Sequence, residues 1–232
     1  MTAKNPICVA LDTPDLVRAV ALAKALSPCV GYMKVGMEFF YAHGQAGYEK
    51  IAGEGLPIFL DLKLHDIPNT VGMAMKSLMR LSPRPAIVNV HAAGGLDMMR
   101  AAVDAVAGQS MLIAVTILTS LSDDDIWAAG FETAKDTQAH ARGLAELSRR
   151  AGLDGVVCSP HDLVGIRHDL GRDFLTVVPG IRPADAAAQD QKRVATPAAA
   201  MAAGADILVI GRAITGAPDP AKAAQDILAS LR

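Results

Sequence analysis

Short apolar runs of β-forming residues recur along the whole chain and alternate with stretches of helical character. The runs are Pro6–Leu11, Val30–Val35, Pro57–Leu62, Ala86–Val90, Leu112–Leu118, Gly155–Val157, Phe174–Val178 and Ile207–Ile210. The helical stretches include Asp15–Leu26, Thr70–Leu81, Leu96–Ala107, Thr137–Ala151 and Ala221–Leu231. Alternation predicts parallel strands joined by right-handed crossovers, and eight repeats without an antiparallel excursion favour a closed barrel. We therefore expect an α/β fold, a TIM (β/α)₈ barrel, with a single domain over residues 1–232.

The composition agrees with a large aliphatic core and indicates which partners and which cellular location to expect. Hydrophobic residues make up 51% of the chain but aromatic residues only 4%, which suits a parallel sheet wrapped in helices. The net charge of -2, without a run of Lys or Arg, argues against a nucleic-acid partner. Three widely spaced cysteines argue against a disulfide framework or a zinc site. There is no signal-peptide pattern and no run long enough to span a bilayer, so we expect a cytoplasmic protein without a membrane partner.

Most of the apolar runs end in a polar residue that is useful for chemistry. These residues are Asp12, Lys34, Asp61, Lys63, His91, Thr116, Thr119, Ser159, Arg182 and Arg212. A single Asp at a strand end is usually a turn or a helix cap. In a barrel, however, the carboxyl ends of all strands meet at one mouth, so the whole set predicts an active site there. The longest polar gaps, Thr119–Asp136 and Pro179–Arg193, follow the fifth and seventh strands and are candidate binding loops.

The most informative segment is Asp61-Leu62-Lys63-Leu64-His65-Asp66-Ile67-Pro68-Asn69-Thr70. Because strand side chains alternate, Asp61 and Lys63 share one face. A buried ion pair adds little net stability, so a carboxylate beside an ammonium at a barrel mouth indicates a role in chemistry. Asp66 adds a second carboxylate and Lys34 a second cation from the neighbouring strand. We expect the network to hold Lys63 as a positioned proton donor.

A second pattern predicts a phosphate site. Gly211-Arg212 closes the eighth strand, and Gly180 and Arg182 follow the seventh. The loops after these two strands form the usual phosphate site of such barrels. Glycine lets the main chain approach phosphate oxygens, and the guanidinium of Arg212 offers a planar fork of donors.

These motifs resemble the orotidine 5′-phosphate decarboxylase family, in its bacterial form. The resemblance covers nearly the whole chain: VALD at 9–12, KVG at 34–36, DLKLHDIPNT at 61–70, NVHAAGG at 89–95, VTILTS at 115–120, DGVVCS at 154–159, PGIRP at 179–183 and VIGR at 209–212. It implies conversion of orotidine 5′-monophosphate (OMP) to UMP and CO₂, the last step of de novo pyrimidine nucleotide biosynthesis, by a homodimer that uses no metal and no organic cofactor.

The resemblance also implies roles for individual residues. Lys63 would be the proton donor to C6 of the pyrimidine, and Asp61 and Asp66 would complete the charged network, with Asp66 supplied by the other subunit. Substrate binding would fall to Asp12, Lys34, Ile67, Thr70, Thr119, Arg182, Gln191, Gly211 and Arg212. In this set Asp12, Lys34 and Thr70 would contact the ribose, with Thr70 acting across the subunit boundary, and Thr119 or its neighbour Ser120 would contact the pyrimidine. Arg182, Gln191, Gly211 and Arg212 would bind the phosphate.

Two alternatives remain open at this point. Magnesium-dependent sugar-phosphate decarboxylases and aldolases of the same barrel superfamily share an Asp-x-Lys-x-x-Asp strand end, although His65 and the Ile67–Thr70 continuation favour the orotidylate branch. A non-catalytic barrel that only binds a phosphorylated ligand would need the phosphate residues but not the Asp61, Lys63 and Asp66 set. For His91 we favour a structural or positioning role over catalysis, because no carboxylate lies near it in sequence.

Overall fold

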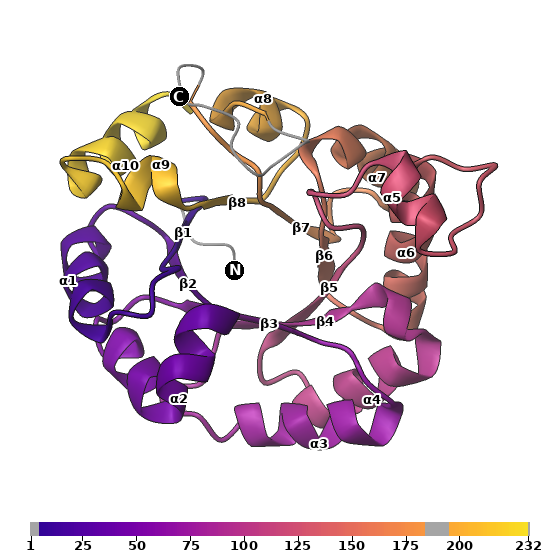
Figure 1. Cartoon of the computed structure of the whole chain (residues 1–232), viewed down its shortest axis with the longest axis horizontal. Coiled ribbons are helices and arrows are strands. Elements are labelled where there is room, and N and C mark those ends of the chain that lie inside the picture. The colour runs from indigo at the N-terminus through magenta and orange to yellow at the C-terminus, as the bar shows by residue number, and fades with distance from the viewer. Residues whose placement is uncertain (1–4, 184–194, 232) are drawn as a thin grey trace.

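The computed structural model describes residues 5–183 and 195–231, and they form a closed parallel barrel with strand order β1-β2-β3-β4-β5-β6-β7-β8. The strands are β1 (Ile7–Ala10), β2 (Tyr32–Gly36), β3 (Ile58–Leu64), β4 (Ile87–His91), β5 (Met111–Val115), β6 (Gly155–Val157), β7 (Leu175–Val178) and β8 (Ile207–Ile210). Figure 1 shows the strands as a central ring with the helices around it. The predicted TIM (β/α)₈ barrel is therefore confirmed; that one domain extends over all of residues 1–232 stays a prediction.

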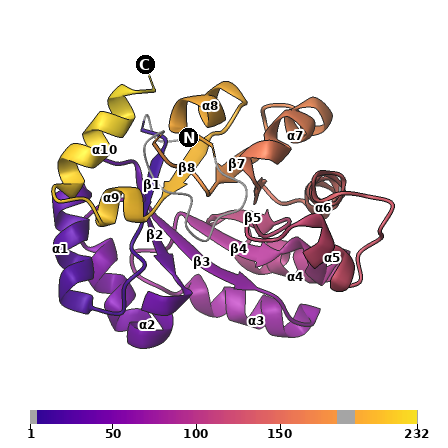
Figure 2. The ribbon, with the colours of Figure 1, turned by 45° about the horizontal axis from the view of Figure 1, so that its top comes forward.

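The helices of the described ranges form the outer layer of the barrel, as a tilted view also shows (Figure 2). They are α1 (Leu16–Leu26), α2 (Met37–Ala52), α3 (Pro68–Leu78), α4 (Leu96–Val106), α5 (Asp123–Ala128), α6 (Thr137–Ala151), α7 (Leu163–Leu170), α8 (Pro197–Ala202), α9 (Arg212–Thr215) and α10 (Pro220–Ala229). Asp15, Asp136 and Asp219 cap α1, α6 and α10 through side-chain oxygens that accept N–H bonds of the first turn. Within the described residues, no helix combines the length and the hydropathy needed to cross a bilayer.

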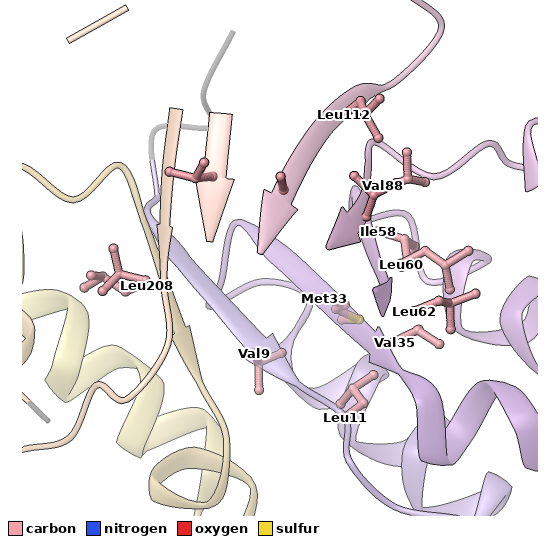
Figure 3. Packing of buried hydrophobic residues seen from close by; sticks show 14 of the residues in the cluster. Val9, Leu11, Met33, Val35, Ile58, Leu60, Leu62, Val88, Leu112 and Leu208 are labelled. Carbon is pink, nitrogen blue, oxygen red and sulfur yellow. The ribbon is translucent and has the colours of Figure 1, made fainter. Parts of the chain in front are cut away.

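Strand side chains alternate between two cores. Outward residues such as Val9 and Leu60 pack with the helices, and Figure 3 shows their neighbours on the adjacent strands. Inward residues such as Cys8, Tyr32 and Phe59 fill the barrel interior. The same alternation carries Lys34 and Asp61 inward, because they stand two residues beyond Tyr32 and Phe59. Polar groups therefore follow the apolar filling at the carboxyl end of the barrel.

Several elements differ from the sequence expectation. The fifth apolar run continues to Leu118, but β5 ends at Val115, and residues 117–120 line a cavity at the end of the barrel. Helix α2 was not predicted, since Gly44 lies inside it with a left-handed φ of 56° and interrupts the helical pattern. The polar gap after β5 also contains a short helix, α5, which starts at a Ser122–Asp125 capping box.

Candidate active site

A cavity of about 600 Å³ opens at the carboxyl ends of the strands, as expected for a barrel of this kind. The predicted residues that line it are Asp12, Lys34, Asp61, Lys63, Thr119, Arg182, Gly211 and Arg212. They come from β1, β2, β3, β5, β7 and β8 or from the segments directly after these strands. Ser120 lines the cavity as well as Thr119, so both alternatives for the pyrimidine contact lie at its wall.

A chain of charges crosses the floor of this cavity. The Nζ atom of Lys34 lies 2.9 Å from Oδ1 of Asp12 and 3.3 Å from Oδ2 of Asp61. The other oxygen of Asp61, Oδ1, accepts a hydrogen bond of 2.7 Å from Nζ of Lys63. Lys34 and Asp61 are buried, whereas Lys63 is half-buried and Asp12 exposed. Cations and carboxylates thus alternate, and Lys63 is the more exposed of the two lysines that line the cavity.

The electrostatic balance keeps both buried members of this chain charged. Burial alone would raise the pKa of Asp61, but Lys34, Lys63 and hydrogen bonds from Lys63 and Asn89 outweigh it, and the pKa lies below its ordinary value. Burial alone would lower the pKa of Lys34, but Asp61 and Asp12 outweigh it, and the pKa lies above its ordinary value. At neutral pH the network therefore contains a carboxylate and an ammonium with little access to water.

Gly36, at the end of β2, provides the space for the first ion pair. A Cβ atom built at this position would lie 3.0 Å from Oδ1 of Asp12 and 3.0 Å from Nζ of Lys34. A larger residue would therefore push apart the two groups that approach each other at 2.9 Å. The KVG motif at 34–36 consequently includes a residue whose small size matters for the site, which we did not single out from sequence.

The main chain at Lys63 has an unusual conformation. Its φ is 53°, in the left-handed region, which costs a non-glycine residue on the order of 1–2 kcal/mol. The pairing of β3 with β4 shifts register here: Leu60 pairs with Val88, but Leu64 pairs with Val90. Residues 61–63 thus bulge from the ladder, and the N–H of Lys63 donates instead to Oδ1 of Asn89 over 2.8 Å.

Glycine and arginine residues form the opposite side of the cavity. Gly180 has a φ of 75°, which allows the sharp turn after β7. The N–H of Arg182 donates to the carbonyl of Ala195, and the N–H of Ala195 donates to the carbonyl of Gly180. These two bonds fix the main chain next to Arg182. Arg212 begins α9 directly after Gly211, so the two guanidinium groups come from the last two strands of the barrel.

Among the described residues, three that were given catalytic or binding roles do not line the cavity of the single chain. Asp66, Ile67 and Thr70 are exposed beyond the end of β3, where Oδ1 of Asp66 accepts a hydrogen bond from the N–H of Ile67. The predicted phosphate contact of Gln191 lies outside the described residues. His91 ends β4 and stacks on His65 with ring centroids 5.3 Å apart. Burial, together with His65 and Lys63, lowers the pKa of His91 and favours its neutral form.

The fold and the site together define a barrel enzyme whose cavity combines a lysine–aspartate network with two arginines on the opposite wall. The chain belongs to the orotidine 5′-phosphate decarboxylase / HUMPS family, whose model matches residues 5–227. It is 52% identical to the orotidine 5′-phosphate decarboxylase of Novosphingobium aromaticivorans, over 98% of this chain and 99% of the relative. It is 49% identical to that of Paramagnetospirillum magneticum, over 98% of each chain. A crystal structure of orotidine 5′-phosphate decarboxylase from Lactobacillus acidophilus superimposes with a TM-score of 0.83 at 36% identity, covering 99% of this chain and 100% of that one.

Proposed function

We propose that this protein decarboxylates OMP to UMP and CO₂, the last step of de novo pyrimidine nucleotide biosynthesis, and that it needs neither a metal nor an organic cofactor. The observation that carries the proposal is the Lys34–Asp61–Lys63 network, which lies at the floor of the cavity of a family barrel. The choice of substrate is supported by relatives that are named for this activity and are about 50% identical to this chain over nearly its full length.

Lys63 is the proton donor in this proposal. Loss of CO₂ from C6 of the pyrimidine leaves a pair of electrons on a carbon whose neighbouring groups cannot fully delocalise it. The ammonium of Lys63 can stabilise that charge and then transfer a proton to C6, which completes UMP. Its half-buried position at the wall of the cavity and its bond to Asp61 are suited to this step, because the donor is held but not enclosed.

Asp61 would face the carboxylate that departs. Two negative groups in a poorly hydrated site repel each other, and this repulsion is relieved when CO₂ leaves. Asp61 is suited to the role because the two lysines keep its pKa low and its side chain ionised. We further propose that Asp66 of a second subunit completes the network.

Binding of the ribose and the phosphate would occupy the rest of the cavity. We propose that Asp12, Lys34 and Thr70 contact the ribose and Thr119 the pyrimidine, with Ile67 beside the substrate. We propose that Arg182, Gln191, Gly211 and Arg212 bind the phosphate. The two arginines line the side of the cavity formed after β7 and β8, away from Lys63 on β3. Binding energy from the distant phosphate can then be expressed in the transition state.

A homodimer would account for the residues that the single chain leaves outside its cavity. Exposed apolar side chains occur on the same two helices: Ile67, at the start of α3, is 66% exposed and Met73 on α3 56%, while Met37 and Tyr41 are exposed on the neighbouring α2. Large apolar side chains left exposed on adjacent helices are a feature of interaction surfaces. We propose that a second copy covers this face and that Asp66 and Thr70 reach across to its cavity. We also propose a cytoplasmic location, which suits the three free and buried cysteines.

The direct test is the ultraviolet change on mixing the EDTA-treated protein with OMP. Conversion to UMP without added metal supports the proposal. Within the described part of the chain, no group of three or more His, Cys, Asp or Glu side chains is placed to hold a metal ion. Activity that appears only with magnesium, and on a sugar phosphate instead of OMP, would assign the chain to the sugar-phosphate branch of its family. Tight binding of UMP without any turnover would favour the ligand-binding alternative.

A further inference from the structure

Asn89 is the first residue of the NVHAAGG motif at 89–95, but neither the sequence analysis nor the proposed reaction gives it a role. It lies in the middle of β4, and the alternation of the strand turns its side chain into the barrel. Only about 1% of its surface is exposed, so both ends of its side-chain amide must find partners inside the protein. Those partners are the two residues of β3 on which the proposed chemistry depends.

The amide bridges the main chain of Lys63 and the side chain of Asp61. Oδ1 of Asn89 accepts the N–H of Lys63 over 2.8 Å, and Nδ2 donates to Oδ1 of Asp61 over 2.7 Å. Its orientation is fixed by chemistry, because a main-chain N–H can only donate and a carboxylate can only accept. The same oxygen of Asp61 also accepts the ammonium of Lys63. Asn89 therefore holds Lys63 at both ends, directly at its main chain and through Asp61 at its Nζ atom.

The bulge in β3 explains why a side chain is needed here. A regular parallel ladder would satisfy the N–H of Lys63 with a carbonyl of β4, but the register shift between Leu60 and Leu64 removes that partner. Asn89 replaces it and stabilises a left-handed conformation that lysine otherwise disfavours. An uncharged amide can do this without altering the charge balance between Asp61 and the two lysines.

We propose that Asn89 is a positioning residue for decarboxylation, which sets the place and direction of the Lys63 ammonium by holding the Lys63 main chain and the Asp61 carboxylate together. It touches neither substrate nor product. The inference rests on the proposed function, because the productive position of Lys63 is defined by the reaction.

Replacement of Asn89 should impair turnover much more than binding. In Asn89→Ala the N–H of Lys63 and one oxygen of Asp61 lose a partner, and the bulge can relax. A displacement of about 1 Å of a reacting group costs roughly 100-fold in rate, so we expect kcat to fall about 100-fold. The Kd for UMP should change less than about 3-fold, since the arginines that line the far side of the cavity are untouched. Equal losses in kcat and in UMP affinity would overturn the proposal.

The isosteric variant Asn89→Asp separates positioning from general stability. The new carboxyl group can accept from Lys63 in either state but can donate to Asp61 only when it is protonated. The charged groups around it are Asp61 and Lys63 on β3 and Lys34 on β2, with His91 two residues further along β4. Two adjacent carboxyl groups resist joint ionisation. The ratio of variant to wild-type kcat should therefore rise as the pH is lowered from about 8 to about 5.5, and a ratio that does not change with pH contradicts the proposal.

A readout that does not depend on the reaction is hydrogen exchange at the amide of Lys63. This amide should exchange slowly in the wild type and at least about 10-fold faster in Asn89→Ala. Unchanged exchange at Lys63 would overturn the proposal even if no substrate were turned over, and a wild type inactive on OMP would instead count against the proposed function.

Thr176→Val serves as the matched control for loss of buried polar contacts. Thr176 is fully buried on β7, and its hydroxyl bonds with Arg167 and Asp206 near the amino end of β8. This variant should lose thermal stability while keeping the wild-type dependence of kcat on pH. If Asn89→Ala does not fold, the comparison of Asn89→Asp with Thr176→Val is sufficient to test the proposal. The same dependence of kcat on pH in these two variants would overturn it.

Discussion

Oδ2 of Asp61 lies 3.3 Å from Nζ of Lys34, and both side chains are buried at the floor of the cavity. Removing two charges from water is costly, and apolar residues of similar size would often stabilise a fold at least as well. The pair is nevertheless continued by Asp12 on one side and Lys63 on the other. The proposed chemistry explains why the pair lies beside the cavity. Because the pair is costly to bury, removal of one partner should have a large effect on stability.

Asp61→Asn should destabilise the protein in a pH-dependent manner. The variant leaves the ammonium groups of Lys34 and Lys63 without the carboxylate between them, and loss of one partner of a buried pair costs on the order of 3 kcal/mol. The pKa of Asp61 is lowered by folding, so its contribution is present above the ordinary carboxyl pKa and is lost as the pH falls through its folded-state pKa. The pKa of Lys34 is raised, so its contribution is present below the ordinary lysine pKa and is lost as the pH rises through its folded-state pKa.

Urea unfolding at one fixed protein concentration measures this difference. The difference in the free energy of unfolding between wild type and Asp61→Asn should be largest between about pH 4 and about pH 10 and should become smaller below and above this range. Asp226→Asn is the control, because it breaks an exposed ion pair with Lys222 on α10 that water screens. A difference in unfolding free energy that is the same at all pH values would contradict the charge balance between Asp61 and the two lysines.

Lys63→Ala should remove turnover while leaving ligand binding largely intact. Loss of a positioned proton donor costs about 10²- to 10⁴-fold, and here the same group also stabilises the carbanion, so we expect the upper end of that range. UMP carries no departing carboxylate, and its Kd should change less than about 10-fold. Lys222→Ala, on the exposed face of α10, should match the wild type in both assays. Comparable losses of turnover and of UMP binding would exclude Lys63 as the proton donor.

The sequence predicted the barrel well because its main signals are local. Each of the eight predicted runs overlaps an observed strand, and strand ends in a barrel converge regardless of the details of the loops. Alternation also predicted that Asp61 and Lys63 would face the same way, and the structure joins them at 2.7 Å, although through a bulge instead of a regular strand.

Features that depend on contacts between strands could not be predicted in this way. Asn89 satisfies a main-chain donor exposed by the register shift between β3 and β4, and no local pattern encodes that shift. Gly36 is needed because the side chain of Asp12, just after β1, and that of Lys34 on β2 meet next to it. The one available signal was that Asn89 lies two residues before His91 and so shares its face. Helix α2 was missed for a different reason, since Gly44 and Gly47 weaken its helical propensity.

Arg212→Ala should act through the phosphate of the substrate. The guanidinium can bind two phosphate oxygens at once, so we expect kcat/KM for OMP to fall about 100-fold or more. Orotidine, which lacks the phosphate, provides the discriminating comparison: wild type and variant should turn it over at rates within about 2-fold of each other. Arg150→Ala, at the exposed end of α6, controls for loss of a positive charge. An equal decrease in activity on OMP and on orotidine would show that Arg212 does not act through the phosphate.

Mixing two inactive variants tests whether the active site is shared between subunits. If Asp66 serves the cavity of its partner, a dimer of one Lys63→Ala and one Asp66→Asn chain contains one site with both changes and one intact site. Random exchange makes half of the dimers mixed, so roughly a quarter of the wild-type activity should return. Asp61→Asn mixed with Lys63→Ala is the matched control, because both residues line the cavity of the same chain and every site stays defective. Recovery in the first mixture alone would explain why Asp66 lies exposed beyond β3, whereas no recovery in either mixture would return Asp66 to a role within its own chain.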